Sequence, residues 1–252
     1  QINDHWHCKL NLQISQRAPF LNEQYSNGVH HGTASFEKGN DGLQPERLIN
    51  VSYSIHHKSE KWQVLVNLFE TYSPNFIYLT PFGDSIVTTV RGPFPYYQFQ
   101  ASKVNLRGAD FWLEFQPITN WALFFKGALV SSWNFSTDDY LIFQPADRFE
   151  TGLRFSKNLN QKGLSLEWSA GPIMVLKQGR VPQRTDLAPA PPGYILLNSR
   201  LGLRNSNGKN QFDFSIEGQN LTNEAYRDYL NRFRYFAYDL GRNVSFRMTL
   251  HF

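Results

Sequence analysis

The sequence predicts an all-β protein, namely an antiparallel transmembrane β-barrel to which this chain contributes about ten strands. Three observations predict it. Apolar and polar residues alternate along many segments, several of these segments exceed about ten residues, and their connections alternate between short and long. Alternation gives a strand one apolar and one polar face. Long strands joined in turn by short turns and long loops are typical of outer-membrane barrels.

Composition agrees with this fold class. The chain is 15% aromatic and 18% charged, and aromatic residues suit the pleated surface of a sheet. Its mean hydropathy is −0.46, and no segment approaches the roughly 18 apolar residues of a membrane-spanning helix. A membrane β-strand is polar at every second position, so a low mean hydropathy excludes a helical membrane protein but not a barrel.

Period-two alternation defines the predicted strands. It is clearest from Val244 to Phe252, where every even position is apolar and every odd position is polar. The same pattern recurs from Lys9 to Ser15 and from Phe212 to Glu217. The predicted strands are residues 6–17, 47–58, 62–73, 97–116, 120–133, 147–157, 163–176, 193–204, 211–221 and 242–252.

The predicted connections alternate in length. Short turns are expected at Lys58–Lys61, Gln116–Thr119, Asn158–Lys162 and Asn205–Asn210. Long loops are expected at 18–46, 74–96, 134–146, 177–192 and 222–241. A soluble antiparallel sandwich also alternates, but its strands usually have about five or six residues. Strand length and loop alternation therefore favour the barrel.

One long alternating run changes phase. From Phe99 to Phe115 the apolar positions shift by one residue at Gly108-Ala109, which predicts a β-bulge there. With this bulge, the polar residues expected to face the barrel interior are Lys9, Asn11, Arg107, Asp110, Glu114, Glu167, Asp213, Glu217 and Arg247. Aromatic residues near strand ends suggest an interfacial girdle, with ordinary packing as the alternative. They are Trp62, Trp121, Trp168, Tyr194 and Phe252.

Several function classes receive no support. The net charge of +4 comes from basic residues spread along the chain, so no nucleic-acid partner is predicted. Cys8 is the one cysteine, which excludes an intrachain disulfide, and it is expected to face outward with Leu10 and Leu12. The sequence has no nucleophile motif, H-E-x-x-H or phosphate loop, so neither catalysis nor a cofactor is predicted. Asp138-Asp139 is interpreted as a turn.

A series of motifs resembles TonB-dependent outer-membrane receptors. The first is Arg17-Ala18-Pro19 with Glu23-Gln24-Tyr25, followed by Gly39-Asn40 and Leu43-Gln44-Pro45-Glu46. Later matches are Asn75–Leu79, Val104–Asp110 (with Asp110 where the family usually has Glu), Pro191–Tyr194, Gly218–Tyr226, Gly241-Arg242-Asn243 and the terminal Phe252. These motifs follow the family's order along essentially the whole chain.

The resemblance implies a barrel of about 22 strands filled by an N-terminal plug. Residues 1–252 are then expected to be the C-terminal part of that barrel, with the plug and the first strands outside this chain. It further implies location in the bacterial outer membrane and uptake of a scarce nutrient, namely a metal ion, haem or a metal chelate such as a siderophore. The implied partners are membrane lipids, the remaining strands and plug, and TonB through the N-terminal part; a surface lipoprotein is a further candidate.

One alternative function is kept open. An outer-membrane enzyme, a protease or a lipase, could be built on a self-contained ten-strand barrel. That architecture requires residues 6–17 to pair with residues 242–252.

Two histidines are candidate metal or haem ligands. His30 and His31 lie in a long predicted loop, and their Gly-Val-His-His-Gly-Thr run resembles zinc- and haem-associated branches of the receptor family. Imidazole is the commonest metal-binding side chain near neutral pH. The alternative is that one of them packs against the plug or a neighbouring loop. For His5, Trp6 and His7, near the start of the first strand, an interfacial role is favoured over ligation.

A second candidate site lies in the last long loop. Residues 226–238 are rich in Tyr, Phe and Arg, which can bind an anionic or aromatic ligand by stacking and cation–π contacts. The proposed ligand-binding residues of this loop are Tyr229, Arg232, Arg234 and Tyr235. Packing between loops at the barrel mouth is the equally weighted alternative.

Overall fold

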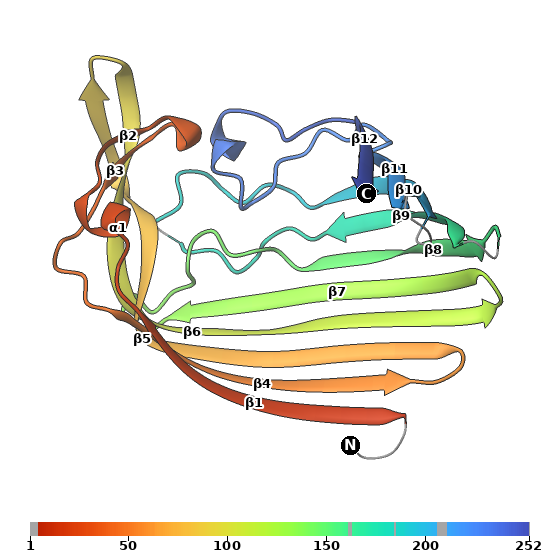
Figure 1. The fold of residues 1–252 in the computed structure, drawn as a ribbon. Coiled ribbons are helices and arrows are strands. Elements are labelled where there is room, and N and C mark those ends of the chain that lie inside the picture. Colours follow the sequence, from red (N-terminus) through yellow and green to blue (C-terminus); the bar gives the residue numbers. More distant parts are fainter. Residues whose placement is uncertain (1–4, 161–162, 184, 206–210, 252) are drawn as a thin grey trace.

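The computed structural model describes residues 5–160, 163–183, 185–205 and 211–251, which form one curved 12-stranded sheet (Figure 1). Its main path follows the sequence, with antiparallel neighbours throughout, and contains every predicted strand. The path is β1 (Trp6–Arg17), β4 (Glu46–Lys58), β5 (Trp62–Thr89), β6 (Gly92–Ile118), β7 (Trp121–Asn134), β8 (Arg148–Asn158), β9 (Leu164–Val175), β10 (Tyr194–Asn205), β11 (Gln211–Gln219) and β12 (Asn243–His251). Residues 161–162 and 206–210 of two predicted turns lie outside the described residues.

Strands β1 and β12 are the two ends of this path. Within the described part of the chain, β1 pairs with β4, β12 pairs with β11, and β1 and β12 do not pair with each other. The pairing that a self-contained ten-strand barrel requires is therefore not the pairing that these residues form.

The sheet has one apolar face and one polar face. Leu10, Leu12 and Ile14 of β1 are 70%, 72% and 61% exposed, and Phe246 and Met248 of β12 are 70% and 65% exposed. This exposure is too extensive for a water-facing surface and matches the lipid-facing side of a barrel. No helix among the described residues is long and apolar enough to cross a membrane.

Aromatic rings line the short-turn edge of the apolar face, as predicted for a girdle. The ring of Trp62 stacks on Phe115 at 4.3 Å, and Trp121 packs against Phe155 at 5.0 Å and Trp168 at 6.2 Å. The prediction for Tyr194 is wrong. Tyr194 begins β10 at the opposite edge, and its hydroxyl donates a hydrogen bond to Asp228 of the last loop. Phe252 lies outside the described residues.

The prediction of a loop at 74–96 is wrong, because β5 and β6 continue through this segment as a hairpin that turns between Thr89 and Gly92. Prolines interrupt the alternation in this segment. The hairpin accommodates them through register shifts between Ser73 and Phe76 and between Pro81 and Ile86. The preceding loop, predicted at 18–46, contains α1 (Leu21–Tyr25), β2 (Asn27–His30), the 3-10 turn η1 (His31–Thr33) and β3 (Ser35–Lys38). Strand β3 pairs in parallel with β6.

The bulge predicted at Gly108-Ala109 is also wrong. Both neighbours of β6 pair through this point without a register shift, with Phe69 opposite Gly108 on β5. The apolar positions change phase in the sequence because Val104 points inward yet is fully buried. Arg107 therefore shares the outward face with Ala109, and the prediction that it faces inward is wrong.

Gly108 is required by a close approach rather than by its backbone angles. A Cβ atom at this position would lie 2.4 Å from the carbonyl oxygen of Leu129 and 2.5 Å from the ring of Phe69. Gly202 of β10 offers a matched control, because the nearest atoms to its added Cβ would be 3.9 Å away.

We expect Gly108→Val to destabilise the protein by about 1–3 kcal/mol, the usual cost of overpacking a filled site. Gly202→Val should leave stability nearly unchanged. The measurement is the free energy of unfolding in urea after folding into lipid vesicles. Equal effects of the two variants would contradict the close approach at Gly108.

Candidate functional site

The long loops gather at one edge of the sheet and form a mouth. Figure 1 shows α1, β2 and β3 rising at one side of this edge, and the loop that carries η2 (Arg232–Tyr235) reaching towards them from the other side. Three groups of contacts build the mouth: an ion network at the end of β1, two arginines of the last loop, and an apolar pocket between the loops.

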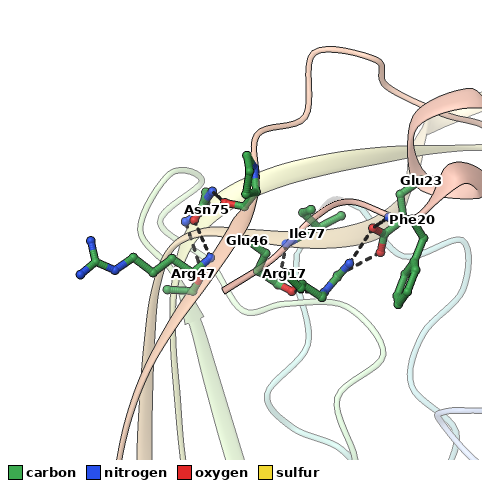
Figure 2. A network of polar contacts seen from close by, with 9 residues as sticks. Arg17, Phe20, Glu23, Glu46, Arg47, Asn75 and Ile77 are labelled. Carbon is green, nitrogen blue, oxygen red and sulfur yellow. Dashed lines mark hydrogen bonds and ion pairs between the residues drawn. The ribbon is translucent and has the colours of Figure 1, made fainter. Parts of the chain in front are cut away.

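The ion network is centred on Arg17, the last residue of β1 (Figure 2). Its guanidinium donates to both oxygens of Glu23 at 2.8 and 3.0 Å and to Glu46 at 2.5 Å. Glu23 also accepts the backbone N–H of Phe20 at 2.8 Å, which starts α1. The two glutamates are only 7% and 4% exposed, so one arginine compensates two buried carboxylates.

The same network extends to β5. The second oxygen of Glu46 accepts the backbone N–H of Ile77 at 3.0 Å. Asn75, in the irregular stretch after Ser73, accepts the backbone N–H of Arg47 at 3.1 Å and donates to the carbonyl of Pro45 (Figure 2). The residues of the R-A-P and L-x-P-E motifs thus fasten the first long loop to the sheet.

The first arginine of the last loop, Arg232, is partly buried and reaches across the mouth. Its guanidinium donates to Glu37 at 3.0 Å and to Ser35 at 2.8 Å, both on β3. It also lies 4.5 Å above the ring of Tyr97, which is 2% exposed. Residues almost 200 positions apart in the sequence are joined by this contact.

The second, Arg234, is 3% exposed and is held by Asp186 at 2.6 Å. Its guanidinium lies between the rings of Tyr229 and Tyr235, at 4.6 and 4.3 Å. The Tyr235 hydroxyl donates to Asp186 at 2.7 Å. Burial, followed by this hydrogen bond, raises the pKa of Tyr235, so the hydroxyl stays a neutral donor.

The four candidate residues of the last loop therefore come together, but they contact one another, β3, β6 and Asp186. This is the packing alternative raised by the sequence. Arg234 and Tyr235 also line a pocket, whereas Arg232 and Tyr229 do not. A role of the four residues in ligand binding stays a prediction.

The pocket has a volume of about 730 Å³ and opens at the mouth. Three segments enclose it: the tip of the β5–β6 hairpin, the proline-rich segment 187–193 and residues 224–238. Its walls are mainly apolar and aromatic, with Arg227 and Glu224 among its few charged residues. Sequence reasoning missed Phe94 as a lining residue. Phe236 and Tyr238 belong to the aromatic run 226–238 that the sequence singled out, although they are not among the four residues proposed from it. The runs Pro93-Phe94-Pro95 and Pro189–Pro192 were the available signal.

His30 and His31 are exposed at the mouth, at the end of β2 and the start of η1. Nδ1 of His30 lies 3.0 Å from the Thr33 hydroxyl, and Nε2 of His31 accepts from Arg91 at 2.5 Å. In the part of the chain that the structure describes, no group of three or more His, Cys, Asp or Glu residues could hold a metal ion. The metal or haem role of the two histidines stays a prediction.

The histidines at the start of β1 lie at the short-turn edge. The ring of Trp6 packs on His57 at 4.3 Å, and His7 stacks on His56 at 6.2 Å. Cys8 pairs in register with Ile55 on the apolar face, as expected.

Comparison with known proteins identifies the fold. The family model described as "TonB dependent receptor-like, beta-barrel" matches residues 1–221. The copper transporter OprC aligns with a TM-score of 0.70 at 18% identity, over 98% of this chain and 37% of that one. The siderophore receptor PirA from Acinetobacter baumannii aligns with a TM-score of 0.61 at 14% identity, over 99% of this chain and 39% of that one. The FrpB iron transporter from Neisseria meningitidis aligns with a TM-score of 0.62 at 13% identity, over 100% of this chain and 37% of that one. The chain spans under two-fifths of the length of each.

We expect Arg234→Ala in the complete receptor to open the last loop, because it leaves the carboxylate of Asp186 buried and unpaired. Loss of one partner of a buried pair costs about 3–5 kcal/mol. Amide hydrogen exchange of residues 226–238 should therefore accelerate by about a hundredfold or more. Arg227→Ala is the control, because Arg227 lies over the ring of Tyr238 without a carboxylate partner in the described structure. Equal exchange in both variants would contradict the role of the Arg234–Asp186 pair.

Proposed function

Since the chain belongs to the TonB-dependent receptor-like β-barrel family of bacterial outer-membrane proteins, we propose that it forms part of the wall and mouth of a transporter. The transporter takes up a metal chelate from outside the cell with energy from TonB. The observation that carries this proposal is the mouth pocket, which combines a volume of about 730 Å³ with mainly apolar and aromatic walls. Such walls suit a bulky ligand with aromatic or aliphatic groups.

The rest of the barrel completes this transporter. Strands β1 and β12 each present an unpaired edge in the described structure. Backbone groups in lipid need hydrogen-bond partners, so the complete protein closes these edges with further strands. The polar inner face, which includes Lys126 paired with Glu150 and Arg154 paired with Glu114, then faces a plug domain that TonB acts upon.

A chelate fits the pocket better than a bare ion does. Phe94, Phe236 and Tyr238 offer ring faces, and Arg227 offers a cation for an anionic group on the ligand. Bare metal ions bind instead to imidazole, thiolate and carboxylate groups. The names of PirA, a siderophore receptor, and FrpB, an iron transporter, agree with this substrate class.

The double variant Phe236→Ala/Tyr238→Ala tests the pocket. We expect the dissociation constant of the complete receptor for its chelate to rise about tenfold or more, because buried aromatic contacts dominate such sites. A ferric catecholate chelate and haem are the probes, measured by equilibrium binding. Phe233→Ala is the matched control, since Phe233 is an exposed phenylalanine of the same loop that does not line the pocket. Unchanged binding of a probe that the wild type binds would exclude the pocket as its site.

A bare ion is the second candidate substrate, favoured by two exposed imidazoles at the mouth and by the copper transporter OprC among the similar structures. His30→Ala/His31→Ala should then lower the affinity for Cu²⁺ or Zn²⁺ by about tenfold or more, as loss of ligands does at metal sites. Binding of the ferric catecholate should stay unchanged. Metal affinity equal to that of the wild type would remove the two histidines as ligands.

A further inference from the structure

A groove on the outward face of the sheet combines an apolar floor with a charged upper rim. It has a volume of about 680 Å³ and crosses β4 to β7. Its outward-facing floor residues are Val51, Tyr53, Leu68, Ala109 and Leu129, and its charged residues are Glu70, Arg107, Asp147 and Arg180. The floor is continuous with the apolar belt, and the charged residues lie towards the long-loop edge. In outer-membrane barrels that edge is extracellular.

Arg107 leaves its charge available to a ligand. It is exposed and stands opposite Glu70 in the register of β5 and β6. Glu70, however, accepts a hydrogen bond from the side chain of Asn105 at 2.6 Å. Within the described residues, Arg107 forms neither an ion pair nor a hydrogen bond through its side chain. A free guanidinium at the headgroup level of a membrane is a ready partner for phosphate.

The surroundings of Arg107 are also cationic. Arg180 is fixed by both oxygens of Asp147 and remains 29% exposed. Lys103, four residues before Arg107 on β6, lies over the rings of Tyr72 and Phe135. Arg47 of β4 is exposed and shares the phase of Val51 and Tyr53, and its side chain extends away from the ion network (Figure 2). Four cations thus stand against two carboxylates on this face.

From this geometry we propose that the groove binds a phosphate-bearing lipid of the outer leaflet. An acyl chain lies along the apolar floor, and Arg107 and Arg180 bind the phosphate group. The guanidinium of Arg107 can donate two parallel hydrogen bonds to phosphate oxygens, which a point charge cannot do. This lipid site is on the opposite face of the sheet from the substrate pocket and is independent of the proposed transport substrate.

The test uses the complete receptor, purified in detergent and stripped of lipid. Hexa-acylated lipid A with two phosphate groups is the probe, and native mass spectrometry measures the dissociation constant of the bound lipid. We expect Arg107→Ala to weaken binding about tenfold or more, because a hydrogen-bonded charge is lost. Arg107→Lys should restore part of the affinity. Lipid A without phosphate groups should bind to the wild type as weakly as the phosphorylated form binds to Arg107→Ala.

Lys157→Ala is the matched control, because Lys157 is an exposed cation near the short-turn end of β8. It should bind lipid A like the wild type. The proposal is overturned if Arg107→Ala binds lipid A as tightly as the wild type does, if removal of the phosphates has no effect, or if Lys157→Ala weakens binding equally. Substrate binding at the mouth serves as the folding check for every variant.

Discussion

The mouth of this barrel depends on a single guanidinium, that of Arg17, placed between the carboxylates of Glu23 and Glu46. Arg17 and Glu46 are register partners at the last paired position of β1 and β4. The network therefore lies where the sheet stops being a membrane wall and the loops begin. Burial costs each carboxylate several kcal/mol of solvation, and the attraction of the arginine offsets this cost. This explains why the arginine, both glutamates and the intervening helix belong to one motif.

The same chemistry recurs across the mouth. Arg232 pairs with Glu37, and the buried Arg234 pairs with Asp186, so the last loop is fixed to β3 and to the residue before the proline-rich segment by charge and stacking together. Arginines that look from the sequence like ligand contacts thus hold the walls of the pocket. Apart from a few charged residues such as Arg227, the pocket lining consists mainly of aromatic rings and prolines at the loop tips. This division gives the mouth a rigid frame and an apolar, adaptable lining.

The strand pattern could be predicted because side chains that face lipid must be apolar. An outward side chain must be apolar and its neighbours need not be, so alternation marks β1, β11 and β12 clearly. The prediction of strand phase and strand ends failed in segments where outward side chains do not have to be apolar. Val104 faces inward yet is fully buried, and this apolar inward position looks in the sequence like a bulge at Gly108. Prolines at positions 74, 81, 93 and 95 conceal the continuation of β5 and β6. The mouth contacts join residues up to 197 positions apart, such as Arg232 and Ser35, and no local pattern encodes them.

The most direct test of the account is the accessibility of spin labels along β1 and β6 in the complete receptor, placed in a lipid bilayer. Labels at Leu10, Leu12, Ala109 and Phe111 should be accessible to oxygen dissolved in lipid. Labels at Lys9, Asn11 and Asp110 should not be, and the label at Arg107 should follow the phase of Ala109. A uniform accessibility along β1, or a label at position 107 that follows the phase of Asp110, would contradict the assignment of the two faces.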